Sequence, residues 1–353
     1  MRVWQDRPNR MLAPHNPARV DGAATSDDDR DFAPRLPQVL DRDDYRLSAD
    51  ELRPLTRIDG WVTARHVALE WLCILGTAWL CERFFSPLLL AASCVVIGSR
   101  LHALGILAHD GAHGLLAKSR RRNDLVVELL LAWPVLLSFD GYRAMHQLHH
   151  RELNTARDPD WARNRPDRLE SRRGVVDFLR VLGGLHKEQR QMMNMVAAAA
   201  NPSPRATSRK RLRIAIYVVV VALAVAARRP DLLLLYWLLP FATWFVFSMR
   251  WKGTAEHFAV ENQEACNAAR TVLPSLPARL LLAPKNVHFH IEHHLYPSVP
   301  FYRLPALHAA LMAKPGFAAR AHLTPSYWRF LIEAWRFRRA GAADPQPAGA
   351  RSP

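Results

Sequence analysis

The feature that most constrains this chain is a set of long runs without a charged side chain. The clearest run, Leu232 to Met249, covers 18 residues, although Asp, Glu, Lys and Arg make up 23% of the sequence. Such a run is typical of a helix that crosses the roughly 30 Å hydrocarbon core of a bilayer. The alternative, a soluble protein in which these runs are buried core helices, is the weaker interpretation because the charges crowd into the tails and one middle stretch.

Four segments are predicted to cross the membrane: 61–83, 86–108, 212–229 and 231–250. A fifth stretch, 124–139, has only 11 consecutive uncharged residues and contains Pro134, so it is predicted to be interfacial or re-entrant. The expected fold class is therefore all-α: an integral membrane bundle of about four transmembrane helices with a cytoplasmic helical cap, within residues 51–325.

The remaining segments are polar or amphipathic. Residues 1–50 are rich in Arg, Asp and Pro, residues 340–353 consist mostly of Pro and small residues, and neither has an apolar period, so both are predicted to be disordered tails. Residues 326–339 mix aromatic and basic side chains at helical spacing, which favours an interfacial helix on anionic lipid over a docking surface for an acidic electron donor.

Positive charge predicts the orientation. The segment 109–211 holds 19 Lys and Arg residues, whereas the two short loops between paired crossings hold three. By the positive-inside rule, both termini and the middle segment should be cytoplasmic, which makes this a multi-pass protein of the inner membrane. The net charge of +16 comes without a compact basic domain or recognition motif, so nucleic acid is not an expected partner.

Half of the 16 histidines lie in three windows of five residues. The windows are HDGAH at 109–113, HQLHH at 146–150 and HIEHH at 290–294. Positions i, i+3 and i+4 share one face of a helix, so each window aims two or three imidazoles in one direction. Imidazole is a ligand for iron, zinc, copper and nickel, and three such windows indicate a metal site rather than isolated surface or core histidines.

The predicted crossings allow the three windows to meet. Only the non-spanning stretch 124–139 separates the first two windows, and two crossings separate the second from the third, so all three lie on one membrane face. Eight histidines exceed the needs of one ion, which predicts two ions with four to five histidines each, and non-haem iron with open positions for O₂ fits these ligands. Carboxylates within or beside the windows are expected to orient the imidazoles: Asp110, Glu152, Asp158, Glu256 and Glu292.

The three windows, their spacing and the apolar segments around them resemble the histidine boxes of the membrane fatty-acid desaturase family. The neighbouring residues resemble it too: Asn123-Asp124 after the first window, Asp158-Pro-Asp160 after the second, and Asn286 and Pro297 around the third. Ala255-Glu256-His257 resembles a family element that carries one further ligand. The resemblance covers about residues 60–310.

The resemblance implies nine histidine ligands for two irons, with Asn286 among the supporting residues. The implied ligands are His109, His113, His146, His149, His150, His257, His290, His293 and His294. We expect His257 rather than His288 as the ninth, because His288 lies two residues before His290 and would point about 200° away on a helix. His257 also emerges from the crossing 231–250 on the same face as the windows.

The implied activity is O₂-dependent oxidation of an unactivated C–H bond, most simply as a fatty-acyl desaturase. A hydroxylase or other oxygenase of the same superfamily is the alternative, because the histidine boxes predict the cofactor better than the product. A membrane metal-dependent hydrolase is a more distant alternative, because HExxH is missing. The chain has no GxGxxG for a flavin or nicotinamide and no His-Pro-Gly-Gly typical of a fused cytochrome b5, so a separate donor such as a ferredoxin with its reductase is expected.

Two charges inside the first two crossings need partners. Glu70 and Arg100 each lie eight or nine residues from the cytoplasmic end of antiparallel neighbouring helices. At 1.5 Å per residue both would lie roughly 12–14 Å deep. Because an unpaired charge is costly at that depth, we expect the two side chains to face each other.

Overall fold

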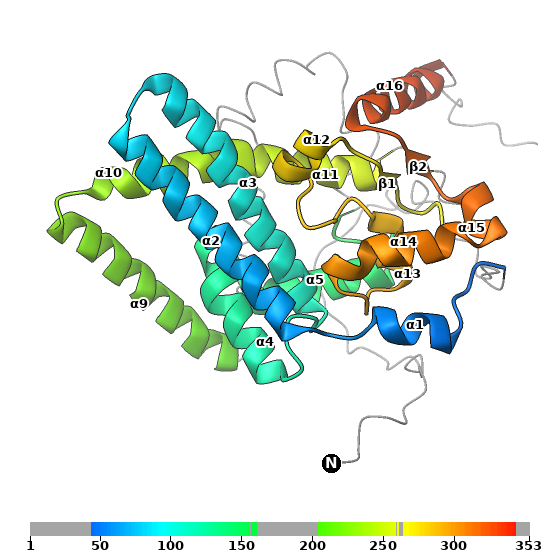
Figure 1. Cartoon of the computed structure of the whole chain (residues 1–353), viewed down its shortest axis with the longest axis horizontal. Helices are drawn as coiled ribbons and strands as arrows, with labels where there is room; N and C mark the ends of the chain where they lie inside the picture. Colours follow the sequence, from blue (N-terminus) through cyan, green and yellow to red (C-terminus); the bar gives the residue numbers. More distant parts are fainter. Residues whose placement is uncertain (1–43, 156, 161–203, 259, 261–263, 344–353) are drawn as a thin grey trace, which may run out of the picture.

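The computed structural model describes residues 44–155, 157–160, 204–258, 260 and 264–343. The chain is mostly helical, and its long helices lie together at one end of the molecule while shorter elements gather at the other (Figure 1). The long helical stretches are α2 (Gly60–Arg83), α3 (Pro87–Ala112), α9 (Pro204–Ala226) and a continuous run of α10 (Pro230–Leu233), η6 (Leu234–Leu238), η7 (Phe241–Phe245) and α11 (Val246–His257). All four predicted crossings therefore coincide with these long helices, except for Ser86 and residues 227–229 at their ends.

Local signals explain where the first two long helices begin. The Asp59 carboxylate accepts hydrogen bonds from the backbone N–H groups of Trp61 and Val62 and so caps α2. Ser86 caps α3 in the same way, and Pro87 follows it at the first helical position, where a missing N–H costs nothing. The loop between α2 and α3 comprises only residues 84–86, so the two helices pack as an antiparallel hairpin.

The apolar character of the helices agrees with a membrane protein. Among the described residues, the stretches Pro87–Ala112 and Pro230–His257 are long and apolar enough to cross a bilayer. The bent pair Arg120–Val135 and Phe139–Arg151, with 93° between its parts, would be a third if it is one broken span. The helices α2 and α9 carry more charge along their length, so the number of crossings stays a prediction.

The stretch 124–139 forms part of that bend. It consists of the end of α4 (Arg120–Val126), the π-helical turn η2 (Val127–Ala132) and the 3₁₀ turn η3 (Trp133–Val135). Leu136 then adopts a left-handed backbone with φ of 59°, and α5 (Phe139–Arg151) leaves in a new direction. Pro134 and the left-handed residue together explain why one straight helix does not form.

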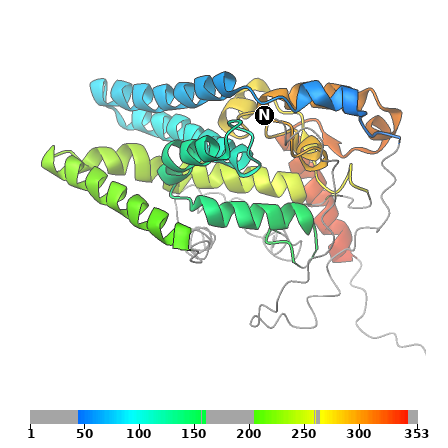
Figure 2. The same ribbon diagram turned by 90° about the horizontal axis from the view of Figure 1, so that it is seen from below.

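The shorter elements form a cap around the histidine windows. They are α1 (Ala49–Leu55), α5, α12 (Leu276–Leu281), α13 (His290–Leu295), η8 (Phe301–Arg303), α14 (Leu304–Met312), α15 (Pro315–Arg320) and α16 (Tyr327–Ala343). A parallel pair of two-residue strands, β1 (Thr271–Val272) and β2 (Leu323–Thr324), joins two distant parts of the cap. Figure 2, turned by 90°, shows the same separation of long helices from cap.

Residues 44–50 of the predicted N-terminal tail are described by the structure, and part of this segment packs against the cap. Tyr45 and Leu47 are buried, with 1% and 5% of their surface exposed, in the same apolar cluster as Leu307 and Phe317 of the cap. The carboxylate of Asp44 also pairs with Arg320 at 2.7 Å. Two apolar residues among charges have no period of their own, so only the tertiary contacts reveal that this segment belongs to the cap. Residues 1–43 and 344–353 lie outside the described residues.

Candidate metal centre

Four helices bring the histidines together. The α3 helix ends on His109 and His113, and α11 ends on His257. The second window lies on α5 and the third on α13, where the i, i+3, i+4 spacing places the imidazoles of each window on one side of the helix. The windows are 33 to 177 residues apart in sequence, counted from the end of one to the start of another, yet their side chains converge inside the cap.

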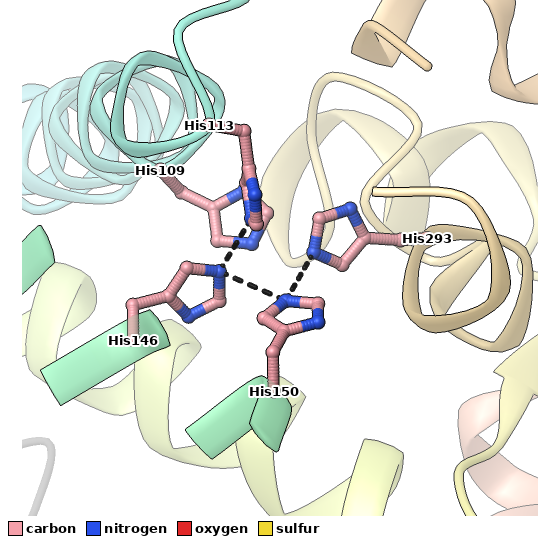
Figure 3. Close-up of side chains that lie close together, drawn as sticks. All are labelled: His109, His113, His146, His150 and His293. Atoms are coloured by element: carbon pink, nitrogen blue, oxygen red, sulfur yellow. Dashed lines mark hydrogen bonds between the residues drawn. The ribbon is translucent and has the colours of Figure 1, made fainter. Parts of the chain in front are cut away.

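The nine histidines fall into two groups, each with one ring nitrogen per residue within 4.8 Å of the others. The group of five is His109, His113, His146, His150 and His293, and Figure 3 shows these imidazoles pointing toward one common centre. The group of four is His149, His257, His290 and His294. The groups are neighbours, because the ring centroids of His150 and His294 are 4.4 Å apart.

The distances within each group suit a metal ion. In the group of five, the Nε2 atom of His146 lies 2.8 Å from that of His113 and 3.1 Å from that of His150. In the group of four, the Nε2 atom of His290 lies 2.8 Å from that of His257 and 3.1 Å from that of His294. Adjacent nitrogens around one octahedral ion, with metal–nitrogen distances of about 2.1 Å, would be about 3.0 Å apart.

Burial affects the hydrogen bonding and the pKa of the histidines in both groups. Both ring nitrogens of His109 are buried without a hydrogen-bond partner, a costly state for a polar side chain unless another group binds it. Burial also lowers the pKa of His113 to about 4 and holds the pKa of His293 and His294 well below the usual value. These imidazoles are neutral at pH 7, which is the form that binds metal.

Three of the expected carboxylates contact histidines of the two groups. Asp158 is buried and accepts a hydrogen bond of 2.8 Å from Nδ1 of His149. Because a carboxylate can only accept, His149 carries its proton on Nδ1 and leaves Nε2 unprotonated. Asp110 lies 3.4 Å from Nδ1 of His109, and Glu256 lies 3.6 Å from Nδ1 of His290.

The other three expected supporting residues bind other groups. Glu152 pairs with Arg157, and Asn286 contacts Arg279 and the Phe301 carbonyl oxygen. Glu292 accepts a hydrogen bond from Thr271 Oγ1 at 2.6 Å and contacts His308. None of these contacts is with a histidine of the two groups: Glu152 follows the end of α5, Asn286 lies in a left-handed turn, and Glu292 meets Thr271 and His308.

The structure gives His257 and His288 different surroundings. His257 belongs to the group of four, and its Nε2 atom faces that of His290. His288 lies outside both groups, with its Nδ1 atom 2.9 Å from the carbonyl oxygen of Val272. Its imidazole therefore joins the loop before α13 to β1, whereas metal binding by His257 remains a prediction.

The expected pairing of Glu70 with Arg100 is confirmed, at 3.2 Å between Oε2 and Nη1. A second cation was missed: Lys285 lies 2.6 Å from the other oxygen of Glu70. Arg100 also donates to the carbonyl oxygen of Leu280. The cluster therefore joins α2 and α3 to the loop that leads into the third window, and no spacing in the sequence predicts the contribution of Lys285.

A buried arginine was also missed. Arg270 is fully buried and donates to the carbonyl oxygens of Ala255 and Phe258, which flank His257, at 2.6 and 2.7 Å. A lone arginine outside any motif gives no sequence signal for this role. Arg270 holds the backbone at the end of α11, where His257 enters the centre.

The family model described as fatty acid desaturase matches residues 85–326, which include all nine histidines. The chain belongs to the fatty acid desaturase family. Its curated relatives include the dihydrorhizobitoxine desaturase of Bradyrhizobium elkanii, 26% identical over 76% of this chain and 79% of that protein. A β-carotene ketolase of Paracoccus sp. (strain N81106 / MBIC 01143) is 26% identical over 70% of this chain and 90% of that protein.

These comparisons confirm the resemblance found in the sequence, and the relatives are oxidoreductases. Proteins of the family use di-iron centres, and this chain has two histidine groups able to bind metal. The apolar helices and the family together indicate a membrane protein.

Proposed function

We propose that this protein is a membrane-bound, O₂-dependent di-iron oxidoreductase that desaturates a fatty-acyl substrate. One observation carries the proposal: nine histidines in groups of five and four, at the ends of apolar helices in a chain of the desaturase family. In the proposed centre the group of five would hold one iron and the group of four the other. Two bound irons would supply the activation of O₂ needed to oxidise a C–H bond.

The protein's own residues hold the imidazoles in place. Asp158 selects the tautomer of His149, which keeps Nε2 directed into the group of four. Arg270 and the Glu70 cluster hold the backbone on either side of His257 and before the third window. Burial excludes water from the centre, because His109, His149 and His293 each expose less than 9% of their surface.

The proposal also specifies the reaction, desaturation, and the substrate, a fatty-acyl chain. Desaturation is favoured by the family description and by the match to a desaturase. A hydroxylase or other oxygenase is the second candidate, because the ketolase match extends over 90% of that relative. Expression of the gene in a host with defined lipids, beside the His109→Ala variant, tests the choice. New double bonds in acyl lipids that the variant lacks support a desaturase, and new hydroxyl or keto groups support the alternative.

Electron supply and orientation complete the proposal. Purified protein with NADPH and O₂ alone should not turn over, whereas addition of a ferredoxin-type donor with its reductase should start the reaction. Turnover with NADPH alone would contradict a separate donor. We further propose that the metal centre and both termini face the cytoplasm, which protease accessibility of terminal tags in inverted and right-side-out vesicles would test.

A further inference from the structure

The α16 helix has an inner face that is fixed to the protein. Tyr327 and Phe330 are buried, and the Phe330 ring lies 6.0 Å from the ring of Trp251 on α11. Glu333, on the same side, accepts a hydrogen bond from Thr324 Oγ1 at 2.9 Å and lies 3.4 Å from Nε of Arg270. These contacts determine which side of α16 faces outward.

The outward side carries a strip of apolar side chains. Trp328, Leu331 and Trp335 expose 71%, 37% and 53% of their surface. At about 100° per residue, the three lie within roughly 60° of one another around the helix axis. Large apolar side chains that are gathered in one exposed strip mark a surface that contacts something other than water.

Two basic residues border the strip. Arg329 and Arg336 are exposed and follow Trp328 and Trp335 by one residue, so they lie about 100° further around the helix axis. Arg329 also lies 3.9 Å from the carboxylate of Glu333, one turn further along the helix. A helix with an apolar strip, tryptophans and a basic edge is the type that lies in the headgroup region of a membrane. Tryptophan prefers this region because its ring is apolar and its N–H is polar.

The position of α16 in the fold is also consistent with the headgroup region of a membrane. Phe330 packs on Trp251, which follows directly after the predicted crossing 231–250. In both ribbon views α16 runs across the direction of α2 and α3 rather than along it (Figures 1 and 2). A helix that meets the end of a crossing and runs across the bundle would lie near the membrane surface.

We propose that the outward face of α16 binds the surface of the membrane in which the protein is embedded, and prefers anionic lipid. Trp328, Leu331 and Trp335 insert at the boundary between headgroups and acyl chains, while Arg329 and Arg336 bind lipid phosphates. An acidic electron donor would satisfy the two arginines, but it would leave the aligned apolar strip without a matching surface. The observations therefore favour lipid, and the test includes the donor as an outcome.

Tryptophan fluorescence of the full-length protein, reconstituted in phosphatidylcholine vesicles, tests the proposal. The chain has 11 tryptophans, so the signal of interest is the difference between the wild type and the W328F/W335F variant. Lipids brominated near the top of the acyl chains should quench this difference signal more than lipids brominated near the chain ends, and aqueous iodide should quench it weakly. Each single variant, W328F or W335F, provides the same comparison if the double variant is unstable.

The contribution of Arg329 and Arg336 to lipid binding is tested separately, with a charge-matched control. Addition of phosphatidylglycerol should increase the quenching by brominated lipid, and R329Q/R336Q should reduce that increase by about twofold or more. R120Q/R121Q removes the same charge from exposed positions on α4 and should leave the increase unchanged. Strong quenching by iodide together with none by brominated lipid would overturn the proposal, as would protection from iodide that appears only when an acidic ferredoxin is added.

Discussion

Replacement of Asp158 by Asn should weaken iron binding at the group of four and spare the group of five. The carboxylate of Asp158 accepts three hydrogen bonds from donors: Nδ1 of His149 at 2.8 Å, the Asn154 backbone N–H at 2.9 Å and the Asp160 backbone N–H at 2.8 Å. The bond from Asn154 reaches one oxygen and the other two bonds reach the second oxygen. Asparagine keeps the volume but offers one oxygen and one NH₂ group.

The hydrogen-bond geometry around Asp158 sets the expected size of the losses in stability and in iron affinity. Whichever way the amide is turned, its NH₂ group faces at least one buried N–H donor, which costs about 1–3 kcal/mol. If the NH₂ group faces His149, the imidazole also loses the partner that selects its tautomer. Loss of such a partner typically weakens metal binding by about 10- to 100-fold, or about 1.4–2.7 kcal/mol.

A matched control flanks the same window. Glu152 is two residues after His150, and its partner Arg157 has a side chain that is 80% exposed. An ion pair with such an exposed partner contributes about 0–1 kcal/mol, so Glu152→Gln should change iron affinity little. A parallel measurement of the unfolding midpoint of both iron-free variants separates lost binding from lost folding.

Iron titration in the presence of a competing chelator measures the effect. At limiting free iron, Asp158→Asn should retain about half of the wild-type iron, because only the group of four contains His149. Equal iron loss in both variants, or full retention in Asp158→Asn, would refute the assignment of Asp158 as the residue that orients His149.

Three further outcomes are expected. His257→Ala should lose iron in the same titration, whereas His288→Ala should keep most of it, and equal losses would contradict the assignment of the ninth ligand. Glu70→Gln leaves two cations buried together and should destabilise the protein by about 3–5 kcal/mol, measured as thermal unfolding in detergent beside the more exposed Glu82→Gln control. Burial lowers the pKa of His113 from 6.5 to about 4, so between these pH values the folded iron-free protein binds fewer protons than the unfolded chain. The stability of the iron-free protein should therefore fall as pH drops from about 6.5 to about 4. A midpoint of thermal unfolding that stays flat or rises over this pH range would contradict the prediction.

Much of the centre could be predicted from the residues because the relevant information is local. The spacing of each window places its histidines on one side of a helix, and the predicted crossings bring the three windows to one face. The Glu70–Arg100 pair was predictable for a similar reason, since helix rise alone sets the depth of both residues. Neither inference needs to know how the helices cross one another.

The division of the histidines between the two groups was decided by the tertiary structure. His149 and His150 are adjacent in sequence, yet they belong to different groups, and His293 is separated in the same way from His290 and His294. Adjacent residues differ by about 100° around a helix, so which group each one joins depends on the angles at which α5, α13 and α3 meet. No spacing within a single helix contains those angles.

The supporting contacts also depend on how distant segments pack. Asp158 reaches His149 while Glu152, which is nearer in sequence to the window, does not. Lys285 joins the Glu70 pair across 215 residues of chain, and Tyr45 joins the cap across a similar separation. The sequence by itself determined the long helices and the histidine side of each window, because these follow from local period and hydropathy. The fold alone decided the partners of each side chain, because they come from loops whose positions are set by long-range packing.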